Sequence, residues 1–308
     1  MSTPATLTGF AAALALTFGG AWALGSSTGP VAPAAAHGAE HATDPTKEDP
    51  MATDTLPAGL AASRAGYTLE LGDDALDAGT RELAFTVHDA TGAPVTSFDV
   101  EHEKRLHLIV VRRDQTGFQH VHPVMDEHGT WRSAIDLTPG SWRVFADFTP
   151  TGGPALTLGT DLAVPGTTTP PAPSAPTRTA QVDDGFEVTV TGDLRGGEDS
   201  TLRLQVSRDG RPVTDLEPYL GAYGHLVALR EGDLAYLHVH PNGAPGDGRT
   251  TAGPAVNFTA EVPTAGRYHL YLDFKQGGVV RTAHLVLDAA PAPAGSTPSR
   301  TPTGGHGH

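Results

Sequence analysis

The chain alternates short apolar and polar stretches, separated by turn-forming residues, over residues 57–289. Residues 67–71 and 83–87 place an apolar side chain at every second position, and turn signals such as ATGAP at 90–94 follow. A period of two is typical of a half-buried β-strand, and we find no helical period in this region. The pattern predicts about seven short strands in each of two segments of roughly 100 residues.

One pair of strands differs from the rest because it is apolar almost throughout, carries histidines at fixed places and occurs twice. His107–Arg112 and Phe118–Pro123 (HLIVVR and FQHVHP) recur as His225–Arg230 and Tyr236–Pro241 (HLVALR and YLHVHP). The two copies are offset by 118 residues without a gap, and the match reaches back to residue 92. The second half of the chain is therefore expected to repeat the fold of the first.

We predict an all-β protein with two tandem immunoglobulin-like antiparallel β-sandwich domains, which we call repeat 1 (residues 57–165) and repeat 2 (residues 179–289). Residues 166–178 form a Pro/Thr linker between them. Late in the repeat the offset grows from 118 to 126, and the loop at 242–254 is the expected place of the eight extra residues.

The two ends of the chain have a different composition. Residues 1–25 contain an uncharged apolar run at 7–24, which we interpret as a transmembrane anchor that leaves the rest outside the cytoplasm. A cleaved signal segment is the alternative, although no Lys or Arg precedes the run. Cleavage within Ala34–Ala36 would expose His37 as an amine-imidazole copper ligand. Residues 26–56 are expected to form a disordered tether, and residues 290–308 a disordered tail.

Composition narrows the possible partners. The chain has no cysteine, so disulfides and thiolate metal sites are excluded. A formal net charge of −15 argues against nucleic acid and against an anionic membrane surface as partners. Contact with the membrane is therefore expected through the N-terminal segment only.

The repeated histidines are the candidate chemistry. Side chains at positions i and i+2 of a strand share a face, so His120 and His122 form one pair and His238 and His240 another. An even hairpin loop puts His107 on the face of His122, whereas an odd loop or a bulge puts it on the other. In the even case each domain offers one metal site of three imidazoles, and the predicted ligands are His107, His120, His122, His225, His238 and His240.

The available donors favour a particular class of metal. Methionine occurs only at positions 1, 51 and 125, so a soft Cu(I) site is disfavoured. Imidazole suits divalent transition metals, and we expect Cu(II) ahead of Zn(II). A carboxylate such as Asp126 or Glu127, or water, would add oxygen ligands. Asp147 and Asp273 occupy equivalent places, where they either orient an imidazole or cap a turn.

Three functional hypotheses follow. The first is an extracytoplasmic, membrane-anchored binder or buffer of a divalent metal, without catalytic activity. The second is a structural or interaction module of the cell envelope, which binds another envelope protein and whose histidines stabilise hairpins. The third is a cupin-like metalloenzyme, because HVH at 120–122 is followed by Glu127; neither a nucleophile elbow nor a phosphate loop is present. His88, His102, His269 and His284 are expected to be structural or isolated.

The anchor, the HLIVVRRD and FQHVHP segments and the second sandwich together resemble a group of exported actinobacterial tandem β-sandwich proteins. Those are distantly similar to the CopC-like and YtkA-like metal-handling modules. The resemblance implies metal handling outside the cytoplasm, although this chain lacks the Met-rich Cu(I) segment that some CopC-like proteins carry.

Overall fold

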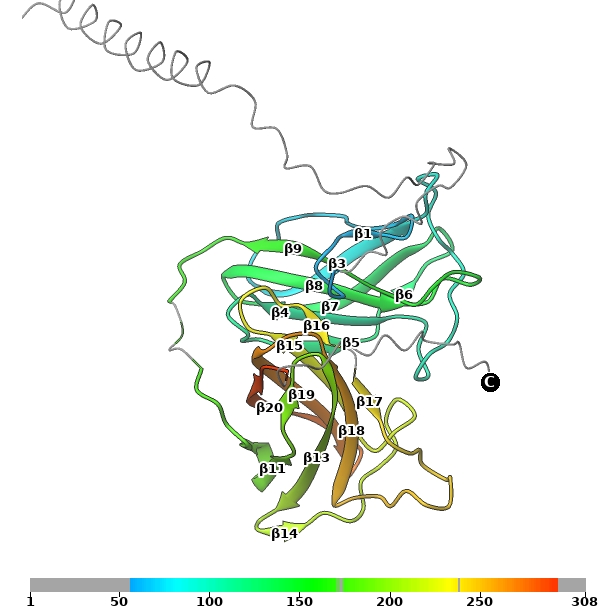
Figure 1. Cartoon of the computed structure of the whole chain (residues 1–308). Coiled ribbons are helices and arrows are strands. Elements are labelled where there is room, and N and C mark those ends of the chain that lie inside the picture. The colour runs from blue at the N-terminus through cyan, green and yellow to red at the C-terminus, as the bar shows by residue number, and fades with distance from the viewer. Residues whose placement is uncertain (1–55, 170, 172–173, 238, 293–308) are drawn as a thin grey trace, which may run out of the picture. The chain divides into compact units, whose positions relative to one another are not determined.

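The structure is a computed structural model that describes residues 56–292, apart from residues 170, 172–173 and 238 (Figure 1). It confirms the all-β class and the tandem sandwiches. In this part of the chain no helix is long and apolar enough to cross a membrane. The predicted anchor, tether and most of the predicted tail lie outside the described residues.

Repeat 1 is a sandwich of two sheets, with strand orders β1-β2-β3-β7-β6 and β5-β4-β8-β9. We call the second one the β4 sheet. Its strands pair antiparallel throughout. The bounds are β1 Ser63–Arg64, β2 Tyr67–Leu71, β3 Gly79–His88, β4 His107–Arg112, β5 Gln119–Val121, β6 Val124–Met125, β7 Thr130–Leu137, β8 Gly140–Phe148 and β9 Leu156–Val164.

Repeat 2 has the same plan, with strand orders β10-β11-β13-β18-β17 and β12-β20-β19-β15-β16. We call the second one the β15 sheet. The bounds are β10 Thr179–Val182, β11 Phe186–Thr191, β12 Leu194–Arg195, β13 Glu198–Arg208, β14 Arg211–Pro212, β15 His225–Arg230, β16 Tyr236–Leu237, β17 Val239–Pro241, β18 Ala255–Val262, β19 Gly266–Gln276 and β20 Val279–Ala290. A 3₁₀ turn, η1, covers Asp183–Gly185. Seven of the eight extra residues lie where they were expected, between β17 and β18, and the eighth lengthens the turn between β18 and β19.

Each sandwich has its own apolar core, built from the side chains that alternate inward along its strands. In repeat 1 this core includes Phe85, Leu108 and Trp131, and in repeat 2 it includes Phe186 and Phe258, all essentially excluded from solvent. The period of two in the sequence places these residues on the inner faces.

Strands β4 and β15 are apolar on both faces because both faces are buried. The inner residues of β4, Leu108 and Val110, belong to the core of repeat 1, whereas Ile109 belongs to a third cluster. That cluster combines residues of both repeats, and its buried members are Ile109, Val111, Phe145, Val227, Leu229, Leu234, Tyr236 and Tyr271. The outer faces of the β4 and β15 sheets therefore pack against each other within one compact unit of the chain.

Candidate metal centre

The register of the first hairpin settles which face the histidines share. In the β4–β5 ladder Leu108 lies opposite Val121 and Ile109 lies opposite His120. This even register puts His107, His120 and His122 on one face, which is the face of Ile109. Because Ile109 belongs to the cluster between the repeats, the three histidines face repeat 2 rather than the core of their own sandwich.

Repeat 2 contributes the fourth imidazole. The rings of His107 and His225, which occupy equivalent positions, stack with centroids 5.5 Å apart and an interplanar angle of 7°. One ring nitrogen each of His107, His120 and His225 lies within 4.8 Å of the other two. The centroid of His122 is 5.0 Å from that of His107 and 4.9 Å from that of His120. We call these four residues the histidine cluster.

The hydrogen bonds around two of these rings fix their tautomers. His107 Nε2 lies 3.2 Å from the carbonyl oxygen of Glu101, which can only accept, so Nε2 carries the proton. His120 Nδ1 lies 2.8 Å from Oδ2 of Asp273 and donates to that carboxylate. In the neutral rings the remaining nitrogens, His107 Nδ1 and His120 Nε2, are therefore both lone-pair donors, and they lie 3.1 Å apart. Two lone pairs at this distance repel each other unless a cation lies between them.

Burial keeps three of the four rings of the cluster neutral. Burial, with the charge of His120 as a second cause, lowers the pKa of His107 to about 4. Burial also lowers the pKa of His122 to about 3, and it holds the pKa of His225 well below its ordinary value. At neutral pH these three rings carry no excess proton, and each keeps one nitrogen available as a donor to a metal.

His122 has a buried nitrogen with no partner. Its Nε2 is excluded from solvent and forms no hydrogen bond within the described part of the chain. Buried polar atoms are almost always satisfied, so an exception calls for a reason, such as an ion that the coordinates do not contain. This atom lies on the ring that borders both His107 and His120.

A carboxylate of repeat 2 orients the cluster. Asp273 accepts from His120, and it also accepts from the hydroxyl of Thr282 at 2.5 Å. The side chains of His120 and Asp273 are 1% and 3% exposed. A carboxylate on the far nitrogen of an imidazole is the usual outer partner of a metal-bound histidine, and it makes the near nitrogen a stronger donor. The expectation that Asp273 orients an imidazole is thus confirmed, although the imidazole belongs to the other repeat.

The matched carboxylate of repeat 1 has different surroundings. Asp147 is half-buried on β8 and accepts a hydrogen bond from Thr157 of β9 at 2.9 Å. Burial raises its pKa to about 6. A group so costly to ionise in place is a weaker orienting partner than Asp273.

The arrangement differs from the expectation of one site in each domain. We expected His225 to act with His238 and His240, but its ring instead lies against His107 and His120 of repeat 1. His240 is exposed on β17, a strand of the other sheet of repeat 2, where it pairs with Thr259. His238 lies outside the described residues. Histidines from the two repeats meet because the repeats pack through their outer faces, which the alternation pattern does not reveal.

Other candidate ligands lie elsewhere. Asp126 accepts from the backbone of His128 and Thr130 and so closes its own turn. Glu127 is exposed beside His128. Sequence reasoning also treated His269 and His284 as isolated, yet His269 Nδ1 lies 2.8 Å from His284 Nε2. Their pairing across β19 and β20 could be found only from the register of those strands.

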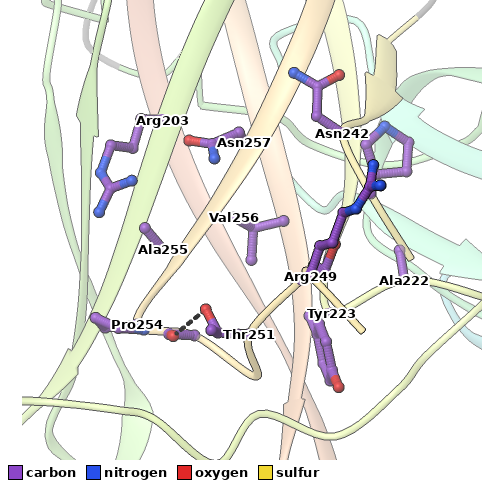
Figure 2. A pocket seen from close by; sticks show the side chains of 14 residues that line it. Arg203, Ala222, Tyr223, Asn242, Arg249, Thr251, Pro254, Ala255, Val256 and Asn257 are labelled. Atoms are coloured by element: carbon purple, nitrogen blue, oxygen red, sulfur yellow. Dashed lines mark hydrogen bonds between the residues drawn. The ribbon is translucent and has the colours of Figure 1, made fainter. Parts of the chain in front are cut away.

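A partly open cavity in repeat 2 has no imidazole or carboxylate among its described lining residues. It has a volume of about 240 Å³ and lies between the loop at 242–254 and strands β13 and β18. Figure 2 shows Arg203, Asn257, Asn242 and Arg249 around it. The histidine cluster is therefore the stronger candidate for a metal site.

The chain belongs to the family described as Domain of unknown function (DUF8832), which matches residues 62–165 and again residues 180–291. The two matches fall on the two sandwiches. No curated protein matches the chain. Because the family description names no activity, the resemblance to CopC-like and YtkA-like modules remains a prediction.

Solved structures with partial likeness include Salmonella alpha-2-macroglobulin (16% identity, TM-score 0.26, covering 77% of this chain and 15% of that one). The Yersinia pseudotuberculosis adhesin InvE is 13% identical with a TM-score of 0.22, covering 73% of this chain and 59% of that one. The Escherichia coli adhesin FdeC is 18% identical with a TM-score of 0.22, covering 76% and 66%. The chain thus spans less than two thirds of the length of these relatives, and overlaps this weak carry no functional conclusion.

Proposed function

We propose that the chain binds one divalent transition-metal ion between its two repeats, through His107 Nδ1, His120 Nε2 and a nitrogen of His225. The observation that carries the proposal is the pair of lone-pair nitrogens of His107 and His120, which face each other at 3.1 Å. Two imidazole nitrogens bound to one ion at the usual 2.0–2.1 Å lie about 3.3 Å apart on tetrahedral Zn(II) and about 2.9 Å apart at adjacent positions of tetragonal Cu(II). The observed spacing is therefore close to that of two ligands of a common metal.

The surroundings support the same function. Depressed pKa values leave His107 and His225 neutral, which is the form that binds metal. In each of the two rings whose tautomer is fixed, the nitrogen that faces away from the metal donates to an acceptor. The acceptor is the Glu101 carbonyl for His107 and the Asp273 carboxylate for His120. Metal-bound histidines have such partners almost without exception. His122 is not one of the three histidines whose nitrogens converge, but its unsatisfied Nε2 is on a ring that borders them, so either His122 or water would supply a fourth ligand.

Cu(II) is our first choice of metal and Zn(II) our second. Imidazole binds both, and the affinity order of divalent metals favours copper. The sequence has no thiolate, and Met125 packs against the core of repeat 1 rather than joining the cluster. Soft ligands that would select Cu(I) are thus missing from the described site. Within this proposal the apolar run at 7–24 anchors the repeats outside the cytoplasm, where they hold or buffer the ion.

A second candidate function rests on the same contacts. A proton can occupy the gap between His107 and His120, and the hydrogen bonds would then run unbroken from Glu101 to Asp273. In that case the rings fasten the two repeats together, and the protein is a structural or interaction module of the envelope. The two functions predict different metal binding, and calorimetry separates them.

The test is a Cu(II) and Zn(II) titration of the full-length protein and of three variants. His120→Ala removes a proposed ligand and its contact with Asp273, and we expect it to abolish the saturable binding of one metal ion per chain. Asp273→Asn should still bind one metal ion per chain, but with an affinity lowered roughly 10–100-fold, as loss of a hydrogen-bond partner behind a ligand does. His128→Ala is the matched control because that side chain is 80% exposed in a surface turn, and it should bind as the unchanged protein does.

Histidines in the tether and tail are the same in all four proteins, so their background binding cancels. An equivalent that survives in His120→Ala would contradict the proposal. If the loss of His120 instead lowers only the stability of the metal-free protein, the structural function is supported.

A further inference from the structure

The turn beside the histidine cluster carries a fifth imidazole, His102. Glu101 and Lys104 exchange backbone hydrogen bonds of 2.8 and 3.0 Å, so His102 and Glu103 form a two-residue hairpin turn. Both turn residues have a positive φ, of +47° and +66°. Such turns favour Gly, which has no Cβ, and Asn, whose short side chain can bond the backbone locally. His occurs in this region more often than most residues, whereas Glu103 is an unfavourable choice for the backbone alone.

Repeat 2 has the same turn with different residues. Tyr219 and Ala222 exchange the matching hydrogen bonds, and Leu220 and Gly221 have φ of +55° and +76°. Leu220 is buried at 1% exposure, whereas His102, its counterpart, is exposed. The turn thus forms without an imidazole, and the His in repeat 1 has no evident structural purpose.

The ring of His102 lies next to the cluster. Its centroid is 5.7 Å from that of His225 and 6.1 Å from that of His107, and it meets both rings edge-on. Among the described residues no hydrogen bond to the His102 ring is found. His107, by contrast, is 4% exposed. His102 is therefore an exposed imidazole directly beside the buried donors.

We infer that His102 is the exchange ligand of the site, through which the metal passes between solvent and the buried nitrogens. This inference rests on the proposed metal-binding function. An ion held by buried ligands leaves slowly unless a new ligand can replace one of them before the others let go. His102 can bind the ion while His107 or His225 still holds it, so that no step leaves the ion with a single protein ligand.

The position of the turn adds to this function. The carbonyl of Glu101, the first residue of the turn, is the acceptor that orients His107. The Glu101 carboxylate in turn accepts from Thr149 at 2.6 Å. These bonds hold the turn against the buried ligands. The exchange imidazole is thus kept within reach of the site although it is exposed.

The experiment compares the rate at which full-length protein loaded with one Cu(II) transfers the ion to excess EDTA, by stopped-flow absorbance. His102→Gly removes the imidazole and suits the positive φ, and we expect transfer to slow by about tenfold or more. Stoichiometry should remain unchanged, and affinity should stay within about threefold. Glu103→Gly is the matched control, since it relieves strain in the same turn and keeps the imidazole. Its transfer rate should equal that of the unchanged protein.

Equal rates in His102→Gly and Glu103→Gly would overturn the inference. So would loss of the bound equivalent in His102→Gly, because His102 would then be a permanent ligand. If the unchanged protein binds no metal at the cluster, the proposed function fails and the exchange ligand fails with it. If metal binds but the rate is indifferent to His102, the exchange ligand alone fails.

Discussion

The two repeats share a histidine motif but use it differently. Repeat 1 turns His107, His120 and His122 toward its neighbour, whereas repeat 2 contributes His225 to the same cluster and presents His240 at an exposed position on β17. The matched carboxylates also diverge, since Asp273 binds a ring of the other repeat while Asp147 accepts from Thr157 in its own sandwich. A duplicated sequence therefore gives one histidine cluster built from both repeats rather than one cluster in each repeat. Because the two repeats pack against each other, residues at matched positions have different surroundings.

The largest expected effect tests the packing that creates this difference. Phe145 and its counterpart Tyr271 both lie in the cluster between the repeats. Phe145→Ala should lower the free energy of unfolding by about 3–5 kcal/mol, because it empties a fully buried position. Tyr271→Phe keeps the ring and removes the hydroxyl that donates to the Gln115 carbonyl, so it should cost only about 1 kcal/mol. Urea unfolding measures both, and a cost below about 1 kcal/mol for Phe145→Ala would contradict tight packing of the repeats.

The next effect tests whether the matched histidines of the two repeats contribute unequally to metal affinity. His122 and His240 occupy equivalent positions in the two HVHP segments. Under the proposed function, His122→Ala should weaken Cu(II) binding by more than the roughly 10–100-fold typical of an outer partner. His240→Ala should leave the affinity of the cluster unchanged, because His240 is exposed on the other sheet. Competition titration with a chromogenic chelator gives both constants, and equal losses would favour one site in each domain.

The smallest effect concerns the pH dependence of Asp147. Burial raises its pKa to about 6, so the folded state holds this proton more tightly than the unfolded state does. Relative to a neutral side chain, Asp147 thus costs nothing below about pH 4 and lowers stability progressively as pH rises through 6. Asp147→Asn should therefore stabilise the metal-free protein at pH 8, on the order of 1–3 kcal/mol, with no gain below pH 4.

Urea unfolding at the two pH values checks this. Asp73→Asn serves as the control, because it removes the same charge from an exposed residue and should show no such change with pH. A constant difference between pH 4 and pH 8 for Asp147→Asn would show that ionisation of this carboxyl has no part in stability.

Sequence alone was enough to predict the all-β class, the duplication, the place of the inserted loop and the histidines that share a strand face. These follow from a period of two and an ungapped offset, which are local properties of the chain. The apolar runs of β4 and β15 have no polar face between their ends, which fits burial on both sides, but they do not say what packs against the outer face.

Which histidines meet depends on register and packing. The even register of the β4–β5 hairpin put His107 on the face of His120, and the packing of the two outer sheet faces then brought His225 and Asp273 to them. The hairpin register joins residues only 13 positions apart, whereas His120 and Asp273 are 153 positions apart, and the alternation pattern does not report contacts at that separation. The strand face that a histidine occupies is a local matter, but what lies across that face is set by the packing of distant strands.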